Sequence, residues 1–309
     1  MGKGLKMFNA RHERSGGRPV PVADIKQGDR DDLICEFCAA RISYVSAYTR
    51  NGKRIAAFLR LQKNVEHALG CSNNVENAVK SLVAQSHNTE HNKALFDNNE
   101  SGYTFRMNVL INAIFDAVKE KKTLDAEEDQ QQKVRRRVQY QQTEKRLADY
   151  FSSAAGIAKI RANIEEKSDK QRLSELITID YNGQKISWND FYYVEDRYPA
   201  LFRRAEKIKH PIAILLTVKE TVKLVDKNTR FYTLKGDVST LSHGEKSKEH
   251  YSPSVNSCTR EFLTKFKQEE EIIVIGFIKT KARPWKSNII YKNMSFWITS
   301  KKQVTKINS

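Results

Sequence analysis

The residues with the clearest chemistry are three cysteines and one histidine near the start of this 309-residue chain. Cys35 and Cys38 are spaced CxxC, and His67 and Cys71 are spaced HxxxC. A zinc ion takes four sulfur or nitrogen ligands in a tetrahedron, and two closely spaced pairs are the usual way to supply them. The spacing therefore predicts a structural Zn²⁺ bound by Cys35, Cys38, His67 and Cys71. Four protein ligands leave no open position for a catalytic water. The alternative is a set of ordinary buried thiols with a core histidine.

The sequence between the two pairs predicts the elements that position them. Residues 41–49 are rich in strand formers, Asn51-Gly52 is a strong tight-turn signal, and residues 54–61 can return as the second strand. A helix is expected over residues 75–85. A knuckle, a hairpin and a helix in this order are typical of a zinc-ribbon or treble-clef-like module, which we expect over residues 1–95.

A second group with recognisable chemistry lies in the last hundred residues, where aromatic and basic side chains are interleaved. From Pro211 to the end there are 18 Lys plus Arg against 9 Asp plus Glu. Cations that follow phosphates and flat rings that stack on bases are the combination that single-stranded nucleic acid binding requires. The alternative is that the aromatics belong to the core and the lysines only solubilise a sheet edge. The residues expected to bind nucleic acid are Arg230, Tyr232, Lys279, Lys281, Arg283, Trp285, Lys286, Tyr291 and Lys292.

Period-two patterning predicts that strands position this second group. The residues from 239 to 257 are expected to form a long polar loop, and those from 279 to 288 a loop between the last two strands. Three strands, a helix and two strands are the order of an OB-fold, so we expect a small OB-like β-barrel over residues 211–309. An SH3-like barrel or an open sheet gives a similar count. The expected strands are 212–218, 222–225, 230–234, 271–279 and 288–299, and the expected helix is 258–268.

Residues 96–210 are expected to form a helical domain that spaces the two ends or makes a homo-oligomer or other protein contact. Apolar residues recur at helical spacing between Leu147 and Ile164, which predicts an amphipathic helix that faces the core. Residues 177–188 contain a central Asn182-Gly183 pair and predict a β-hairpin. Together with the terminal modules, this middle part makes the expected fold class α+β and multidomain.

Composition limits the kinds of partner. The formal net charge is +17 and the sequence pI is about 9.6, which favours nucleic acid over other partners. No apolar run approaches the length of a membrane span, and the N-terminus lacks the apolar region of a secretory signal. Three clustered cysteines do not resemble a disulfide framework, so we expect a reducing compartment, the cytoplasm.

The N-terminal 95 residues resemble the zinc-binding module of the competence-protein CoiA-like family. The likeness consists of the CxxC, an aromatic strand at Phe58, the His-to-Cys pair, and Glu90, His91 and Lys93. The resemblance implies a zinc-binding module beside a restriction-type nuclease domain, in a prokaryotic setting. The nuclease core would need an acidic residue before a strand and then an E-x-K or Q-x-K pair, and the residues after Lys93 have helical periodicity instead.

These observations favour a zinc-containing protein that binds single-stranded DNA or RNA through its C-terminal part. One alternative is a divergent CoiA-like nuclease whose acids come together only in space. Another is an adaptor or assembly subunit of a prokaryotic DNA-processing or phage-defence complex. The sequence has no Gly-rich phosphate loop and no nucleophile elbow, so no catalytic residue is indicated.

Overall fold

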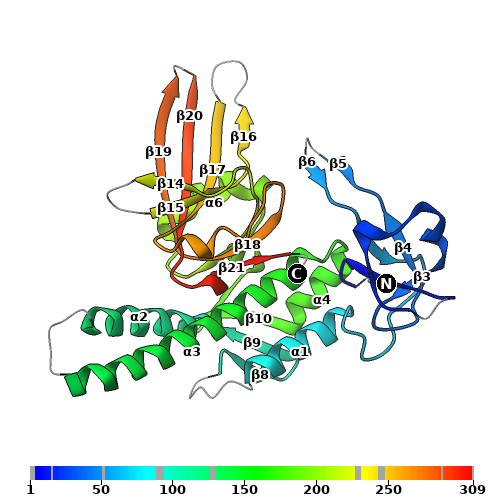
Figure 1. Ribbon diagram of the computed structural model, residues 1–309, viewed down its shortest axis with the longest axis horizontal. Coiled ribbons are helices and arrows are strands. Elements are labelled where there is room, and N and C mark those ends of the chain that lie inside the picture. The colour runs from blue at the N-terminus through cyan, green and yellow to red at the C-terminus, as the bar shows by residue number, and fades with distance from the viewer. Residues whose placement is uncertain are drawn as a thin grey trace.

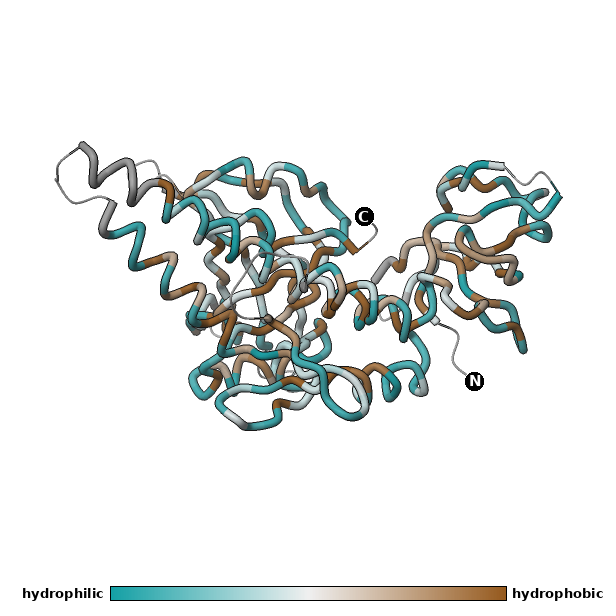
Figure 2. The backbone as a smooth tube through the Cα atoms, turned by 90° about the horizontal axis from the view of Figure 1, so that it is seen from below, coloured by the Kyte–Doolittle hydropathy of each residue, from teal (hydrophilic) through white to brown (hydrophobic). Residues whose placement is uncertain are grey.

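The computed structural model describes residues 4–14, 17–50, 53–87, 94–124, 130–226, 231–242, 248–286 and 288–307. Within these ranges the chain has a mixed α+β fold with several separate sheets. The N-terminal module lies to one side, and the C-terminal sheets lie above the long helices (Figure 1). Seen from below, hydrophobic stretches run through the middle of the larger body, and the N-terminal module stands apart from it (Figure 2). No helix in the described part is long and apolar enough to cross a membrane.

The N-terminal module is built from short strands around a small core of its own. The order of its three-stranded sheet is β2-β1-β3, and two antiparallel pairs, β4 with β7 and β5 with β6, follow. These pairs confirm the expected hairpin, while its Asn51-Gly52 turn lies outside the described residues. The strands are β1 (Asn9–His12), β2 (Val20–Pro21), β3 (Leu33–Cys35), β4 (Ile42–Val45), β5 (Tyr48–Arg50), β6 (Lys53–Ile55) and β7 (Phe58–Leu61).

The middle of the chain combines helices with a four-stranded sheet of order β11-β10-β9-β8. The expected helix after Cys71 is present as α1, and the expected hairpin is present as β10 and β11, with positive φ at Asn182 and Gly183. The helices are α1 (Val75–His87), α2 (Met107–Leu124), α3 (Gln130–Ala162) and α4 (Lys167–Leu176). The strands are β8 (Phe96–Asn99), β9 (Gly102–Arg106), β10 (Ile177–Tyr181) and β11 (Gln184–Ile186).

Two features of this middle part differ in how well the sequence predicts them. The apolar stripe of α3 is buried as expected, because residues at a spacing of 3.6 share one face. Strands β8 and β9 are not expected from the sequence, and they make the region less purely helical. Each buries one aromatic side chain, Phe96 or Phe105, so neither has the alternation that marks a strand.

The C-terminal part contains two sheets. A four-stranded sheet has the order β12-β13-β18-β21, and a six-stranded sheet has the order β14-β15-β17-β20-β19, with β16 paired to β17. Strands β16, β17, β19 and β20 project away from the helices (Figure 1). The elements are β12 (Tyr192–Tyr193), α6 (Tyr198–Arg204), β13 (Ile212–Thr217), β14 (Lys223–Asp226), β15 (Phe231–Lys235), β16 (Ser239–Ser242), β17 (Lys248–Ser257), β18 (Glu271–Gly276), β19 (Ile278–Lys286), β20 (Ile289–Trp297) and β21 (Val304–Lys306).

The four-stranded sheet is covered on both faces. On β18, Ile273 and Ile275 pack into the same core as the stripe of α3, whereas Ile272 and Val274 pack into the core beneath the six-stranded sheet. This burial explains the almost continuous apolar run from residue 271 to 276, since a strand covered on both faces needs apolar residues at every position.

Several expectations for the C-terminal part are wrong. The strands described within residues 211–307 pair as two open sheets and form no closed barrel. The expected loop at 239–257 contains β16 and β17, and the expected loop at 279–288 is mostly strand β19. Both segments are polar because one face meets solvent, and pairing with β15 and β20 stabilises them as strands. The expected helix at 258–268 contains only a 3₁₀ turn, Arg260–Phe262.

Candidate functional site

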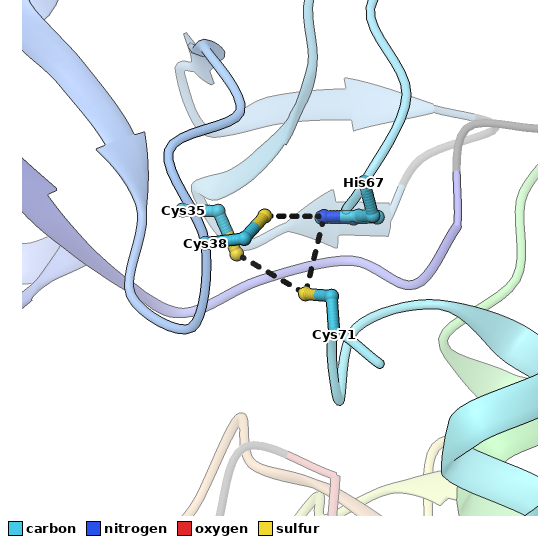
Figure 3. A group of neighbouring side chains, drawn as sticks. All are labelled: Cys35, Cys38, His67 and Cys71. Atoms are coloured by element: carbon cyan, nitrogen blue, oxygen red, sulfur yellow. Dashed lines mark hydrogen bonds between the residues drawn. The ribbon is translucent and has the colours of Figure 1, made fainter. Parts of the chain in front are cut away.

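Cys35, Cys38, His67 and Cys71 come together in the N-terminal module (Figure 3). Cys35 is the last residue of β3, and the tight turn that follows it brings Cys38 back beside it. The backbone N–H of Cys35 donates to Ala40 O at 2.8 Å, which closes this turn. His67 and Cys71 lie in the irregular segment that precedes α1. All four ligand atoms lie within 4.8 Å of one another.

The distances within this Cys₃His cluster match the edges of a metal tetrahedron. The Cys35 and Cys71 Sγ atoms are 3.7 Å apart, and His67 Nδ1 lies 3.5 Å from Cys38 Sγ and 3.4 Å from Cys71 Sγ. Bond lengths of about 2.3 Å to sulfur and about 2.0–2.1 Å to nitrogen give tetrahedral edges of about 3.8 Å and about 3.5 Å. The four residues could therefore bind one metal ion.

Burial shapes the electrostatics of the cluster. It raises the pKa of the Cys71 thiol to about 12, with a further contribution from Cys35 nearby. Burial also acts to raise the pKa of Cys38, but hydrogen bonds from the backbone at Ala68 and Ala40 bring it below its usual value. Burial lowers the pKa of His67 and so favours the neutral ring, which is the form that binds metals. Without a cation, the raised pKa of Cys71 keeps it a neutral thiol, whereas a bound cation would offset the repulsion among thiolates this close together.

The N-terminal segment packs directly against the cluster. Gly4 has a φ of +70°, and a Cβ at this position would lie 2.9 Å from Cδ2 of His67 and 2.7 Å from the backbone O of Asn73. Asn73 itself donates from Nδ2 to Cys35 Sγ at 3.4 Å. Gly4 N–H donates to Asp169 Oδ2 of α4 at 3.0 Å, so this segment links the cluster to the helices. No local pattern marks Gly4 in the sequence, since its role depends on residues far along the chain.

The second expected site lies on the six-stranded sheet. Successive residues of a strand point to opposite faces, and Tyr251, Val255, Met294 and Phe296 mark the face that is buried. The opposite face, which we call the aromatic–basic face, is solvent-exposed or partly so. Its residues on the projecting strands are Thr240, Ser242, Lys248, His250, Ser252, Ser254, Lys279, Lys281, Arg283, Trp285, Ile289, Tyr291, Asn293, Ser295 and Trp297.

A row of side chains crosses the aromatic–basic face. Register places Thr240, His250, Tyr291 and Arg283 side by side on four adjacent strands. The His250 and Tyr291 rings are 5.1 Å apart between centroids, and Trp285 meets Tyr291 edge-on at 5.6 Å. Trp285 is 65% exposed on β19, the edge strand of the sheet. The row therefore presents flat rings to solvent beside a guanidinium.

A second aromatic pair lies at the other end of this face. Trp297 and Phe231 have ring centroids 5.4 Å apart, and Trp297 is 42% exposed. Trp297 lies six positions after Tyr291 on β20, which corresponds to about 20 Å of strand. Lys279 and Lys281 are exposed on the neighbouring strand between the two aromatic groups.

The structure brings together some of the expected nucleic-acid residues and separates others. Lys279, Lys281, Arg283, Trp285 and Tyr291 share the aromatic–basic face. Tyr232 packs against the core, and Lys292 lies on the opposite face, where its Nζ is 2.6 Å from Glu249 Oε1. His250 was not expected in this site, because the polar segment around it has no strand pattern in the sequence. Arg230, Glu90, His91 and Lys93 lie outside the described residues, as does the side chain of Lys286.

Comparison with known proteins finds no matching family model and no matching characterised protein. A putative aspartyl-tRNA synthetase from Leishmania major Friedlin is 11% identical over 40% of this chain and 21% of its own, with a TM-score of 0.23. A small single-stranded DNA-binding protein from Streptomyces coelicolor is 10% identical over 31% of this chain and 92% of its own, with a TM-score of 0.21. Neither likeness is close enough to support an argument about function.

Proposed function

We propose that this protein binds single-stranded nucleic acid along the aromatic–basic face of its six-stranded sheet. The observation that carries the proposal is the row in which His250, Tyr291 and the exposed Trp285 lie beside Arg283. Each base stacked on such a ring contributes about 1–3 kcal/mol, and cations beside it neutralise the phosphates. A duplex hides the faces of its bases, so exposed rings favour a single strand.

The charge on this face supports the same proposal. The strand residues that line it on β15, β16, β17, β19 and β20 include lysines, an arginine and no carboxylate among those whose side chains are described. Glu249 directly precedes His250 in the sequence, but it lies on the opposite face and is paired with Lys292. Along this face of the five strands a polyanion would therefore meet cationic side chains and no described carboxylate.

We further propose that the Cys₃His cluster binds Zn²⁺ and stabilises the N-terminal module. Thiolate and imidazole ligands in a tetrahedron suit zinc, and four protein ligands suit a structural ion. The likeness to the CoiA-like zinc module supports this assignment. An OB-like relationship of the C-terminal sheets, and a cytoplasmic location, stay predictions.

Fluorescence anisotropy with a labelled single strand, its matching duplex and a salt series tests the nucleic-acid proposal. Trp285→Ala should weaken single-strand binding by about 10- to 100-fold, equivalent to about 1–3 kcal/mol. Phe115→Ala is the matched control, because Phe115 is 63% exposed on α2, away from this face. Lys281→Gln should also lower the salt dependence, by about 0.7 in the log–log slope for each phosphate that the protein no longer neutralises.

Equal affinity for duplex and single strand, with no effect of Trp285→Ala, would refute the proposal. The basic face would then fit an acidic protein partner better than a nucleic acid.

A further inference from the structure

A cavity of about 380 Å³ lies in the middle of the chain, away from both sites described above. It opens where the end of α3, α4, the β10–β11 hairpin and the short helix α5 (Trp188–Phe191) meet. Three cationic side chains line it from three different elements: Arg161 from α3, Lys170 from α4 and Lys185 from β11. None of its lining residues is an aspartate or a glutamate.

The positive charge around this cavity is only partly offset, since the guanidinium of Arg161 lies over the ring of Tyr192, 5.6 Å from its centroid. Within the described part of the chain, none of the side chains of Arg161, Lys170 and Lys185 has an ion pair or a hydrogen bond. Burial lowers the pKa of both Arg161 and Lys170, and repulsion from Arg161 lowers that of Lys170 further. Glu165 and Glu166 act in the opposite direction on Lys170, although Glu165 also lies 3.6 Å from Lys6. A bound anion would relieve this repulsion.

Trp188 forms an aromatic wall of the same cavity. Its indole N–H donates to Ile177 O at 3.2 Å, and its ring meets Phe191 edge-on at 6.0 Å, so its orientation is fixed. Thr178 and Ser187 also line the cavity, and the Ser187 hydroxyl oxygen accepts from the backbone N–H of Asp190 at 3.2 Å. A fixed indole, hydroxyl groups and cations together suit a ligand with both a flat ring and a phosphate.

The position of Arg161 alone would not indicate a ligand. Basic residues are common in the last turn of a helix, because they interact favourably with its dipole. The indication comes from the convergence of cations from three elements on one cavity whose volume is within the range of small-molecule sites, about 300–1,000 Å³.

We propose that this cavity binds a nucleoside monophosphate group, either as a free nucleotide or as the phosphorylated end of a strand. The guanidinium of Arg161 and the ammonium groups of Lys170 and Lys185 would hold the phosphate, and the base would stack on Trp188. This site shares no residue with the aromatic–basic face, so the proposal does not depend on strand binding there.

Calorimetric titration of the full chain with adenosine 5′-monophosphate, inorganic phosphate and adenosine tests the proposal. The nucleotide should bind at least tenfold more tightly than either fragment. Lys170→Gln and Arg161→Gln should each weaken its binding at least tenfold, whereas Lys167→Gln, an exposed change on the same helix outside the cavity, should not. Thermal unfolding of each variant checks that the fold is retained.

A 5′-phosphorylated trinucleotide and its 5′-hydroxyl counterpart distinguish the two sources. If the phosphorylated trinucleotide binds more tightly than its 5′-hydroxyl counterpart, and Lys170→Gln removes this difference, the ligand is a strand end. If the two trinucleotides bind equally while adenosine 5′-monophosphate binds tightly, the ligand is a free nucleotide. The proposal is overturned if the nucleotide does not bind, binds no better than phosphate, or binds both cavity variants as well as the unmodified chain. Trp285→Ala should leave nucleotide binding unchanged, which separates this test from that of the aromatic–basic face.

Discussion

Replacing Gly4 by alanine should weaken metal binding, because its Cβ would have no room. That atom would lie 2.9 Å from Cδ2 of His67 and 2.7 Å from the backbone O of Asn73. Non-bonded carbon atoms ordinarily lie about 3.5–4.0 Å apart, so the neighbours would have to move by about 0.5–1 Å. A shift of that size in His67 would take Nδ1 out of the position it holds 3.4 Å from Cys71 Sγ.

An alanine at Gly4 would cost free energy through both its positive φ and the crowding of its Cβ, and two other glycines allow these two costs to be measured separately. Gly70 also has a positive φ, +86°, but its Cβ would meet nothing within 4 Å, and Gly28 has neither feature. Gly28→Ala should change the free energy of unfolding by less than about 0.5 kcal/mol. Gly70→Ala should lower it by about 1–2 kcal/mol through backbone strain. Gly4→Ala should lower it by about 2–5 kcal/mol, because about 1–3 kcal/mol of overpacking is added.

Competition for Zn²⁺ with a chromophoric chelator measures the effect on the metal, and denaturant unfolding measures the effect on stability. Gly4→Ala should lower the metal affinity at least about tenfold, or about 1.4 kcal/mol. Gly70→Ala, next to Cys71, shows how much backbone strain alone changes that affinity. Metal binding as tight in Gly4→Ala as in Gly28→Ala would refute this prediction, since it would mean that the N-terminal segment moves away and leaves His67 in place.

Two further predictions concern metal removal and pH. Cys38→Ser should reduce the bound metal from about one ion per chain to almost none, and it should lower the thermal stability as much as a chelator does. Cys258 is an exposed thiol outside the cluster, so Cys258→Ser should change neither quantity. Metal analysis and thermal unfolding measure the two effects. Burial lowers the pKa of His210, so the unfolded chain takes up a proton before the folded chain does, and the free energy of unfolding should fall as the pH decreases below about 6.5. His210→Phe should flatten this part of the pH dependence in denaturant titrations between pH 8 and 5, and an unchanged slope would assign it to other groups.

Local patterns in the sequence were sufficient where neighbouring residues decide the structure. The Asn182-Gly183 turn, the buried stripe of α3 and the start of α1 all depend on contacts within a few residues, and the structure contains all three. The sequence also predicted the cluster of Cys35, Cys38, His67 and Cys71, because two closely spaced pairs of thiol and imidazole side chains have few other structural uses.

The extended C-terminal strands could not be predicted in the same way. Residues 248–257 are polar on the face that meets solvent, and the segment becomes a strand because β15, β16 and β20 pair with it from distant parts of the chain. The same pairing turns residues 279–286 from an expected loop into β19. Strand preference of this kind depends on tertiary neighbours more than on intrinsic propensity.

The sequence by itself therefore determined which residues could bind a metal and that aromatic and basic residues are interleaved near the C-terminus, because both are matters of residue type and spacing. Only the tertiary structure decided which of these residues share a face. It placed His250 beside Tyr291 and Arg283, and it turned Lys292 to the opposite side of the sheet. It also brought Gly4 against His67 and gathered Arg161, Lys170 and Lys185 around one cavity. The physical reason is that such meetings depend on strand register and helix packing between distant segments, which no local pattern encodes.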